Sequence, residues 1–347
     1  MRAGYAYCFP DWGATLPFAR NLLYFPCMRF SSHPVTVLAP ATVANVVCGF
    51  DVLGFALAEP ADELQLRLTE QPGVVITHED DFGLPTEPAR NVAGAALLAM
   101  LRAVPEEVGV EISIRKTIRP GSGIGSSAAS AAGAVVGLNA LLGNRFSQPE
   151  LVHYAMYGEE VASGARHADN IAPAIYGGVT LIRATLPSPD VVPLDAPPLF
   201  VTVVHPQIEI KTADARRILR QEVPLRDAIR QWGNVGGLVA GLLQHDYALI
   251  GRSLEDVVVE PVRSILIPGF AEVKDGSRVA GALGGGISGS GPALFMLSQD
   301  EATARAVENV MHATYQRLSL DYHTYVTTIH PTGCQVSSEA PAGPESR

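Results

Sequence analysis

The sequence is poor in charged residues and in cysteine. Asp, Glu, Lys and Arg make up 17% of its 347 residues, and the formal net charge at pH 7 is -10. No stripe of Lys and Arg could neutralise a run of phosphates, so we expect no nucleic-acid partner. The cysteines lack the pair spacing of a disulfide framework or a zinc site, which predicts a reducing, cytoplasmic environment. They are Cys8, Cys27, Cys48 and Cys334.

The sequence also lacks a strongly apolar membrane segment. Residues 124–143 carry no charge, and Gly133 and Gly137 have the spacing of a transmembrane dimer face. Ala, Gly and Ser dominate this segment, however, and these residues are too weakly apolar to partition well into a bilayer. We therefore expect no membrane partner.

The first 33 residues lack the clean apolar run of a signal peptide. They mix aromatic residues, cysteine and proline, and we expect them to form a poorly ordered extension. Three origins are open: an organelle transit segment, an appended tail, or an upstream misread start with Met28 as the true initiator. The composition favours a tail or a misread start.

Apolar residues, by contrast, are plentiful at 47%. The chain is longer than one core supports, which predicts two lobes. Predicted strands and helices interleave without a regular βαβ repeat, so each lobe should be α+β rather than a doubly wound sheet. The proline-rich segment 186–198 marks the boundary. The expected lobes are therefore 34–187 and 188–335, and residues 336–347 should form a disordered tail.

Hydrophobic periodicity predicts the secondary structure. Alternating segments indicate strands, and 74–79 is expected to pair with 63–69. Helical apolar spacing indicates helices. The expected strands are 35–39, 63–69, 74–79, 110–116, 177–184, 199–205, 293–298 and 322–330. The expected helices are 91–104, 126–142, 149–163, 214–220, 225–243 and 302–318.

Residues 119–143 join a glycine-rich loop to a helix of small residues. The first turn of a helix offers unpaired N–H groups and a partial positive charge, so backbone alone can bind an anion there. Gly121, Gly123 and Gly125 would let the chain adopt positive φ and approach a phosphate closely. The pattern is neither a P-loop nor a dinucleotide fingerprint. A serine-capped helix after a loop explains the same residues, so nucleotide phosphate is one hypothesis among several at this point.

Four blocks resemble one superfamily. "PGSGIGSSAAS" (120–130) resembles the phosphate loop of the galactokinase, homoserine kinase, mevalonate kinase and phosphomevalonate kinase (GHMP) superfamily. "APATVANVVCGFDVLGFAL" (39–57) resembles the first motif of its homoserine kinases, and "GALGGGISGSGPALFML" (281–297) resembles the superfamily's third motif. "GEEVASGARHADNIAPAIYGG" (158–178) is also similar to homoserine kinases. The resemblance covers about residues 34–335.

The resemblance implies a first lobe like domain 2 of ribosomal protein S5, a ferredoxin-like second lobe, and an active site in the cleft between them. It implies a phosphotransferase with an alcohol group as acceptor, which moves the γ-phosphoryl of ATP to the hydroxyl of L-homoserine in threonine biosynthesis. Homodimers are common in the family. The phosphate loop maps onto Pro120, Gly121, Ser122, Gly123, Ile124, Gly125, Ser126, Ser127, Ala128, Ala129 and Ser130.

Phosphoryl transfer requires positioning and charge stabilisation, and Mg²⁺ requires hard oxygen ligands. The resemblance assigns the Mg²⁺ ligands to Glu159 and the hydroxyl of Ser127. Glu160 adjoins Glu159, but neighbouring side chains on a helix point about 100° apart, so only one should face the site. The resemblance also implies that Asn91 contacts the adenine, where a helix cap is the simpler alternative.

An amino-acid substrate carries a carboxylate, an ammonium group and a hydroxyl, so its pocket should hold charges of both signs. By resemblance Asp51 accepts from the ammonium group, and Asn45 contacts polar substrate groups. Arg216 and Arg263 match the family's paired arginines for the carboxylate, where a planar fork is better suited than a lysine. Arg217 is expected to be solvated. The same pocket should be lined by His167, Thr212 and Gly285.

Asn170 occupies the position where mevalonate kinase has an aspartate proposed as general base. An amide cannot accept that proton, and Asp169 beside it is expected to point elsewhere. The resemblance therefore predicts that Ser127, Glu159 and Asn170 support direct attack by the homoserine hydroxyl, through alignment and Mg²⁺ and without a dedicated base. Two rivals stay open. One is a kinase of mevalonate or a sugar, whose substrates lack the ammonium group that Asp51 would bind. The other is a nucleotide-binding sensor that has lost turnover.

Overall fold

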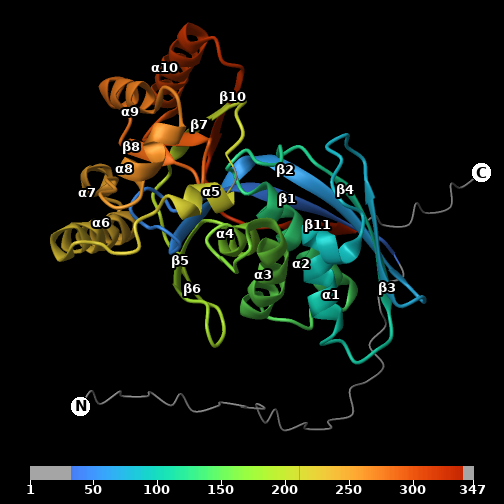
Figure 1. The fold of residues 1–347 in the computed structure, drawn as a ribbon. Coiled ribbons are helices and arrows are strands. Elements are labelled where there is room, and N and C mark those ends of the chain that lie inside the picture. The colour runs from blue at the N-terminus through green and yellow to red at the C-terminus, as the bar shows by residue number, and fades with distance from the viewer. Residues whose placement is uncertain (1–32, 211, 339–347) are drawn as a thin grey trace, which may run out of the picture.

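The structure is a computed structural model, and it describes residues 33–210 and 212–338 (Figure 1). The extension expected for residues 1–33 lies outside the described residues except at its last position. The tail expected from residue 336 begins in a strand, because Gln335–Ser338 pairs with the first strand of the fold. The remainder of that tail lies outside the described residues.

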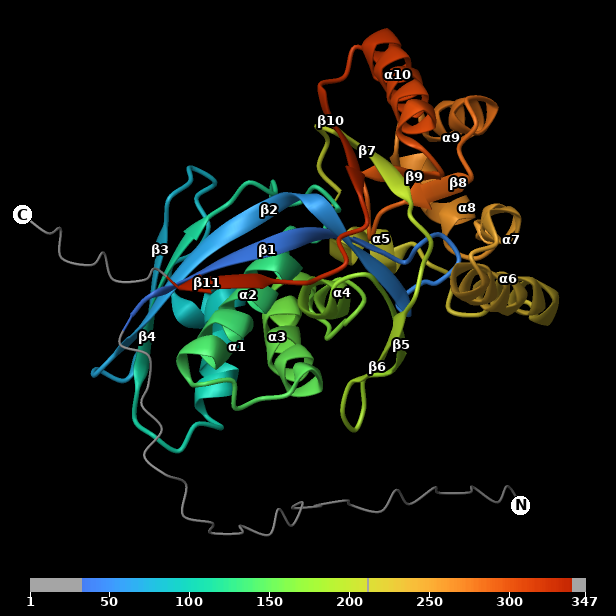
Figure 2. The ribbon, with the colours of Figure 1, turned by 180° about the vertical axis from the view of Figure 1, so that it is seen from behind.

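Among the described residues, the first lobe is a seven-stranded sheet with helices over one face (Figures 1 and 2). The strand order is β11-β1-β2-β4-β3, with β5 beside β2 and β6 beside β5. The strands are β1 (Val35–Ala44), β2 (Leu53–Thr69), β3 (Gly73–His78), β4 (Gly109–Arg115), β5 (Val179–Ala184), β6 (Asp190–Leu194) and β11 (Gln335–Ser338). The helices are η1 (Pro88–Arg90), α1 (Val92–Leu101), α2 (Ser126–Leu141), α3 (Gln148–Ser163) and α4 (Ile171–Tyr176).

Strand β3 corrects one predicted pairing. The periodicity places this segment beside 63–69, but β3 pairs in parallel with β4, from Gly73 opposite Gly109 onward. Strand β2 has no free edge at that point, because β4 pairs with it on one side and β1 on the other. Neighbours in the sequence are therefore not neighbours in the sheet, and β4 lies between them.

The proline-rich segment 186–198 contains a strand that the sequence pattern misses. Strand β6 pairs with β5, and Pro193 is tolerated because β6 lies at an edge of the described sheet. Beyond the second lobe the chain returns, and β11 pairs with β1. The first sheet therefore receives strands from both sides of the predicted boundary at 187/188, and the chain crosses between the lobes twice.

Among the described residues, the second lobe is a four-stranded sheet in the order β10-β7-β9-β8, with α9 and α10 packed against it. Taken in chain order, these strands have the arrangement of a ferredoxin-like lobe, which confirms the predicted α+β class. The pattern misses β8 because it is mostly glycine. The elements are β7 (Phe200–Pro206), α5 (Thr212–Arg217), α6 (Leu225–Gln244), α7 (Tyr247–Ser253), α8 (Glu260–Arg263), η2 (Ser264–Leu266), α9 (Phe270–Val279), β8 (Gly284–Ile287), β9 (Leu294–Ser298), α10 (Glu301–Leu318) and β10 (Tyr322–Thr328).

Helix α2 lies close against β1 and β2 because its inner face is built from small residues. A Cβ at Gly133 would lie 2.8 Å from Leu64 Cδ1, and a Cβ at Gly137 would lie 3.0 Å from Val37 Cγ2. The uncharged segment with transmembrane-like glycine spacing is therefore a core helix. No helix in the described part of the chain is long and apolar enough to cross a membrane.

One aromatic contact joins the two lobes. Phe55 on β2 and Phe295 on β9 are both buried, and their rings meet edge to face with centroids 5.6 Å apart. A β-bridge between Leu57 and Ile329 lies nearby in the chain. The two lobes consequently share a continuous apolar core.

Replacing Phe55 by Ala is expected to lower the free energy of unfolding by about 3–5 kcal/mol, because it leaves a cavity where a buried ring joined the lobes. Urea denaturation followed by circular dichroism measures the loss. Phe82→Ala is the matched control, since Phe82 is 43% exposed and its truncation should cost about 0.5 kcal/mol or less. Equal losses in the two variants would contradict the role given to the Phe55–Phe295 contact.

Candidate active site

A cavity of about 560 Å³ lies between the two lobes. This volume suits a small-molecule ligand. Its walls come from the loop after β4, the β1–β2 connection, α3 and the segment after it, the region of α5 and α8, and the turn after β8. The glycine-rich loop forms one part of the wall, and a cluster of charged side chains forms another.

The glycine-rich loop has the backbone conformation that its sequence predicts. The φ angle is 75° at Gly121, 85° at Gly123 and 72° at Gly125, in the region that favours glycine. A Cβ at Gly123 would lie 2.7 Å from the carbonyl oxygen of Gly291. Gly125 is the N-cap of α2, so the free N–H groups of the first helical turn lie at the cavity wall. This arrangement can bind the oxygens of an anion such as a phosphate group.

The predicted loop residues divide into two groups. One group is buried beneath the cavity wall and supports it: the carbonyls of Ser122 and Ile124 accept hydrogen bonds from the backbone N–H groups of Ala293 and Thr42. The residues of this group are Ser122, Ile124, Ala128 and Ala129. The other group lines the cavity and comprises Pro120, Gly121, Gly123, Gly125, Ser126, Ser127 and Ser130.

The turn after β8 braces this loop from the second lobe. Ser288 Oγ donates a hydrogen bond of 2.7 Å to the carbonyl of Gly123. Gly289 and Gly291 in the same turn line the cavity. Gly285, a predicted substrate contact, instead lies within β8 opposite Met296 and is not part of the lining. The motif is therefore near the site, but pairing within the sheet holds Gly285 away from the cavity.

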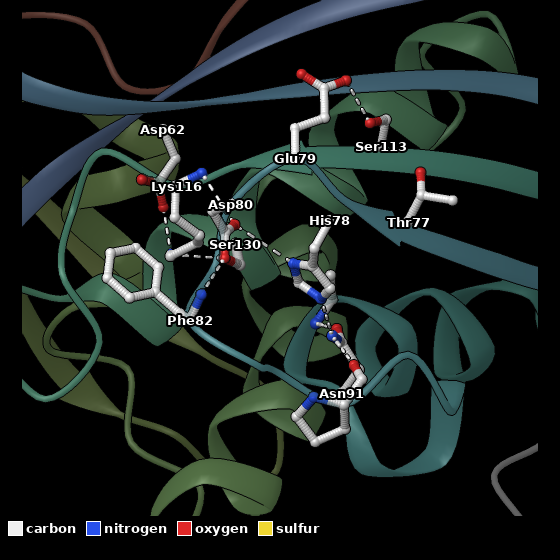
Figure 3. Close-up of polar contacts among 12 residues, drawn as sticks. Asp62, Thr77, His78, Glu79, Asp80, Phe82, Asn91, Ser113, Lys116 and Ser130 are labelled. Atoms are coloured by element: carbon white, nitrogen blue, oxygen red, sulfur yellow. Dashed lines mark hydrogen bonds and ion pairs between the residues drawn. The ribbon is translucent and has the colours of Figure 1, made fainter.

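A buried ion pair holds the two ends of the glycine-rich loop together (Figure 3). The ammonium group of Lys116, just before the loop, pairs with Asp62 on β2. Lys116 Nζ also donates to the carbonyl of Ser126 at 2.7 Å and to Ser130 Oγ at 2.8 Å, both in the first turns of α2. Asp62 Oδ1 accepts from the backbone N–H of Ile118 at 2.9 Å. Burial lowers the pKa of Lys116, and the Asp62 carboxylate opposes that shift.

Sequence reasoning missed this pair, although a signal was present. In β4 the inward positions are Val110, Ile112 and Ile114, and Lys116 continues the same alternation. Asp62 likewise precedes the inward-facing Leu64 on β2. A charge at an inward position must be paired or it destabilises the fold. The partner itself could not be identified without the register of β2 against β4.

Asn91 is buried at the start of α1 and serves as its cap. Its Oδ1 accepts from the backbone N–H groups of Ala93 and Gly94, and its Nδ2 donates to the carbonyl of Pro85 at 2.7 Å. Nδ2 also lies 3.1 Å from His78 Nε2, as Figure 3 shows. These contacts occupy the amide, and Asn91 is not part of the cavity lining. The nearby residues that line the cavity are Leu84, Arg90 and Val92.

Ser127 and Glu159 face each other at the cavity wall. Ser127 Oγ donates to Glu159 Oε2 at 3.1 Å. Burial raises the pKa of Glu159 to about 7, against the opposing effect of the Ser127 hydrogen bond. Glu160 points away and pairs with Arg166 on the exposed side of α3. A hydroxyl and a carboxylate offer the hard oxygens that a divalent cation such as Mg²⁺ prefers.

Charges of both signs gather in another part of the cavity. The Asp51 carboxylate accepts two hydrogen bonds from Arg216, at 2.6 and 3.2 Å. Arg263 lies beside this pair, donates to the carbonyls of Ala215 and Gly289, and has its pKa lowered to about 10 by burial and by Arg216. The Phe50 ring lies 5.3 Å from the Arg216 guanidinium and 5.1 Å from that of Arg263.

Three further polar residues complete this region. His167 lines the cavity with its Nε2 buried and without a hydrogen-bond partner. Asp169 and Asn170 both line the cavity as well. Burial, together with Asp51 and Glu159, raises the pKa of Asp169 to about 7. Asn170 Oδ1 accepts a hydrogen bond of 2.8 Å from Thr42 Oγ1. Thr212, which was also predicted to line this pocket, is the first residue of α5, the helix that carries Arg216.

The β1–β2 connection that carries Asn45 and Asp51 is strained. The φ angle is 70° at Asn45, 40° at Val46 and 64° at Val47. Positive φ is uncommon outside glycine, and β-branched residues such as valine rarely adopt it. Two contacts hold this loop in place. Asn45 Nδ2 donates to the carbonyl of Gly289 at 2.8 Å, and Gln231 on α6 donates to the carbonyl of Cys48 at 2.8 Å. The sequence gives no signal for Gln231, because its role depends on a contact between the lobes.

Comparison with known proteins shows which family has this arrangement. Residues 91–178 match the family model "GHMP kinases N terminal domain", and residues 238–317 match "GHMP kinases C terminal". The homoserine kinase of Chloroherpeton thalassium is 48% identical over 298 residues, which is 82% of this chain and 93% of that protein. The homoserine kinase of Chlorobium phaeovibrioides is 45% identical over 312 residues, 86% of this chain and 98% of that protein. The chain belongs to the homoserine kinases of the GHMP family.

Solved structures agree with this assignment. The crystal structure of homoserine kinase from Cytophaga hutchinsonii has a TM-score of 0.84 and 47% identity, and the match covers 91% of this chain and all of that one. Mevalonate kinase from L. major, at 18% identity and a TM-score of 0.65 over 85% of this chain and 96% of that one, shares the fold. The chain is therefore a kinase, a phosphotransferase with an alcohol group as acceptor.

Lys116→Met is expected to lower the free energy of unfolding by about 3–5 kcal/mol, because it leaves the Asp62 carboxylate buried without a counter-charge. Arg115→Met is a closely matched control. Arg115 pairs with Glu63 one position away on the same strands, but its side chain is 53% exposed, so its loss should cost about 1 kcal/mol or less. Chemical denaturation of both variants measures the difference, and similar losses would refute a special role for the buried pair.

Proposed function

We propose that this kinase transfers the γ-phosphoryl group of ATP to the hydroxyl of L-homoserine, giving O-phospho-L-homoserine for threonine biosynthesis. The observation that carries the substrate assignment is the cluster of Asp51, Arg216 and Arg263 in the wall of the cavity. The names of the related homoserine kinases support the same assignment.

The charge cluster suits the zwitterionic end of an amino acid. Asp51 is the acceptor for the ammonium group, and Arg216 and Arg263 supply planar donors for the carboxylate. In the structure Asp51 and Arg216 satisfy each other. An amino acid can replace this internal pair with two matched contacts, whereas mevalonate or a sugar offers no cation for Asp51. His167, with its free buried Nε2, supplies a further polar contact.

The phosphate end of the cavity suits ATP with Mg²⁺. The backbone N–H groups at the start of α2 bind phosphate oxygens, and Lys116 beneath them holds the loop in position. Ser127 and Glu159 would hold Mg²⁺, which when bound would supply positive charge beside the phosphoryl group that is transferred. Coordination of Glu159 would also offset the burial that raises its pKa.

We assign no general base to the reaction. The side-chain oxygen of Asn170 accepts a hydrogen bond from the Thr42 hydroxyl, and an amide cannot take up a proton. Asn170 therefore has a positioning role and does not act as a base. The chain then contributes alignment of the substrate hydroxyl with the phosphoryl group, and the proton leaves through phosphate or water. Asp169 is the carboxyl group that could overturn this mechanism, because it lines the cavity and its pKa is about 7.

The purified protein is expected to release ADP with L-homoserine and not with mevalonate or galactose in a coupled assay. Arg216→Ala should raise KM for homoserine about 10- to 150-fold, the loss expected for hydrogen bonds to a charged group. Arg217→Ala is the control, because Arg217 is 82% exposed and pairs with Asp214 outside the cavity. Activity with mevalonate alone would refute the substrate assignment, and no turnover with any acceptor would favour a nucleotide-binding sensor.

Asp169→Asn is expected to keep kcat within about tenfold of the wild type if the hydroxyl attacks directly. A general base contributes about 10²- to 10⁴-fold, so its loss would be plain. Because the raised pKa keeps Asp169 protonated below about pH 7, a base would also make wild-type kcat/KM fall as the pH drops below 7. Rate profiles from pH 5 to 9 for both proteins decide between the mechanisms. Direct attack would be overturned if Asp169→Asn still folds, loses much of its kcat, and no longer shows the fall in kcat/KM below pH 7.

A further inference from the structure

Asp51 and Arg263 come from different lobes, and the contacts around them fix how far apart they lie. Asp51 lies near the end of the β1–β2 connection of the first lobe, whereas Arg263 is the last residue of α8 in the second lobe. Figures 1 and 2 show this connection, drawn in blue, reaching from the first lobe toward the helices of the second. A ligand that binds both charges therefore depends on the contacts that join the lobes at this point.

One bridge between the two residues runs through the carbonyl of Gly289. Asn45 Oδ1 accepts a hydrogen bond of 3.0 Å from the backbone N–H of Asp51, and Asn45 Nδ2 donates to the Gly289 carbonyl at 2.8 Å. Arg263 Nη1 donates to the same carbonyl at 3.1 Å. All four residues line the cavity, so this bridge lies on the ligand side of the cluster.

A second bridge runs through Gln231 on α6. Its Nε2 donates to the carbonyl of Cys48 at 2.8 Å and to Asp256 Oδ1 at 2.9 Å, and its Oε1 accepts from the backbone N–H of Val257 at 3.0 Å. Both amide hydrogens and the amide oxygen are therefore used, and a flipped amide would place oxygen against oxygen. Gln231 is not part of the cavity lining, so this bridge lies behind the cluster.

Asp256 continues the second bridge to Arg263. The buried Asp256 carboxylate accepts hydrogen bonds of 2.7 to 3.2 Å from the backbone N–H groups of residues 258–260, which holds the start of α8. Arg263 ends this single-turn helix, so its backbone position follows from where the helix begins. Burial lowers the pKa of Arg263, and the Asp256 carboxylate is one of the charges that oppose this shift.

The connection that Gln231 holds would relax without it. Besides the positive φ angles that precede it, φ is 61° at Asp51. Such a backbone persists only where the surroundings over-determine it. Cys48 is buried, so its carbonyl would lose the Gln231 donor where replacement by water is costly. Relaxation of this connection would move Asp51 relative to Arg263.

We propose that Gln231 is a positioning residue for the amino-acid substrate and sets the spacing between Asp51 and Arg263. This inference rests on the proposed function, in which these two side chains bind the ammonium group and the carboxylate. In an α-amino acid both groups are attached to one carbon, so their two binding partners must keep a fixed separation. Gln231 lies outside the cavity and acts through the β1–β2 connection and through α8.

Gln231→Met is expected to raise KM for L-homoserine about tenfold and to leave kcat within about twofold of the wild type. Without the hydrogen bonds the free protein populates relaxed conformations, and only the competent fraction binds substrate. Saturating substrate restores the competent conformation, so the loss appears in KM. KM for ATP should change by less than about twofold, because Lys116 and Ser288 hold the phosphate loop through separate contacts.

Arg230→Met is a closely matched control. Arg230 adjoins Gln231 on α6 and pairs with Glu255, but its side chain is 58% exposed and the pair lies within the second lobe. KM of this variant for L-homoserine should stay within about twofold of the wild type. Gln231→Asn keeps the amide but is shorter by one methylene, so it cannot span Cys48 and Asp256 together. Its KM should lie between those of the wild type and Gln231→Met.

Amide hydrogen exchange without substrate tests the inference independently of turnover. The backbone N–H groups of residues 51–53 are hydrogen-bonded to acceptors within the β1–β2 connection. Their exchange should be at least about tenfold faster in Gln231→Met and unchanged in Arg230→Met. A wild type that does not phosphorylate L-homoserine would refute the proposed function, and these exchange rates would still decide whether Gln231 holds the connection.

The positioning role is refuted if Gln231→Met leaves both KM for L-homoserine and the exchange rates within about twofold of the wild type. Equal rises in KM for L-homoserine and for ATP would also refute it, because they indicate a general loss of structure. A fall in kcat at unchanged KM would place Gln231 in the chemical step instead. Circular dichroism checks folding, and Gln231→Asn takes the place of Gln231→Met in all measurements if the latter does not fold.

Discussion

The position of the glycine-rich loop depends on the buried ion pair between Lys116 and Asp62. The pair lies where three pieces of chain meet: β2, the end of β4 and the first turns of α2. Each of these alone could shift, and a loop of several glycines has little stiffness of its own. Because breaking the pair would leave a charge unpaired in the core, the pair holds the loop in one conformation, together with the brace from Ser288.

The charged part of the cavity differs from the buried ion pair, because its charged side chains line the cavity and are accessible to a ligand. Asp51 lies at the end of a strained connection that Asn45 and Gln231 hold from two directions. Strain of this kind persists only where the surroundings over-determine the backbone. Arg216 and Asp51 satisfy each other's charge in the structure, and Arg263 beside them is bonded only to backbone carbonyls.

The sequence was most informative where function requires a particular residue type locally. Gly121, Gly123 and Gly125 predicted their own positive φ angles, and the periodicity of 110–116 predicted a strand. The sequence did not predict which distant segments of the chain pair with each other. The partner of Lys116, the parallel pairing of β3 with β4 and the displacement of Gly285 from the cavity all depend on sheet register, which periodicity leaves undetermined. Asn91 shows a different limit of sequence-based prediction. An asparagine at the start of a helix suits both a cap and a ligand contact, so the residue type alone does not distinguish the two roles.

The path of the chain between the lobes has a mechanical consequence. One crossing runs from β6 to β7 and the other from β10 to β11, so two covalent tethers link the two lobes. Two tethers define a line, and rotation about that line stretches neither. Sliding of one lobe across the other would pull on at least one tether and on the strand pairing at its end. The Phe55–Phe295 contact and the shared apolar core oppose both kinds of motion, so the tethers and the packing together fix how the lobes face each other.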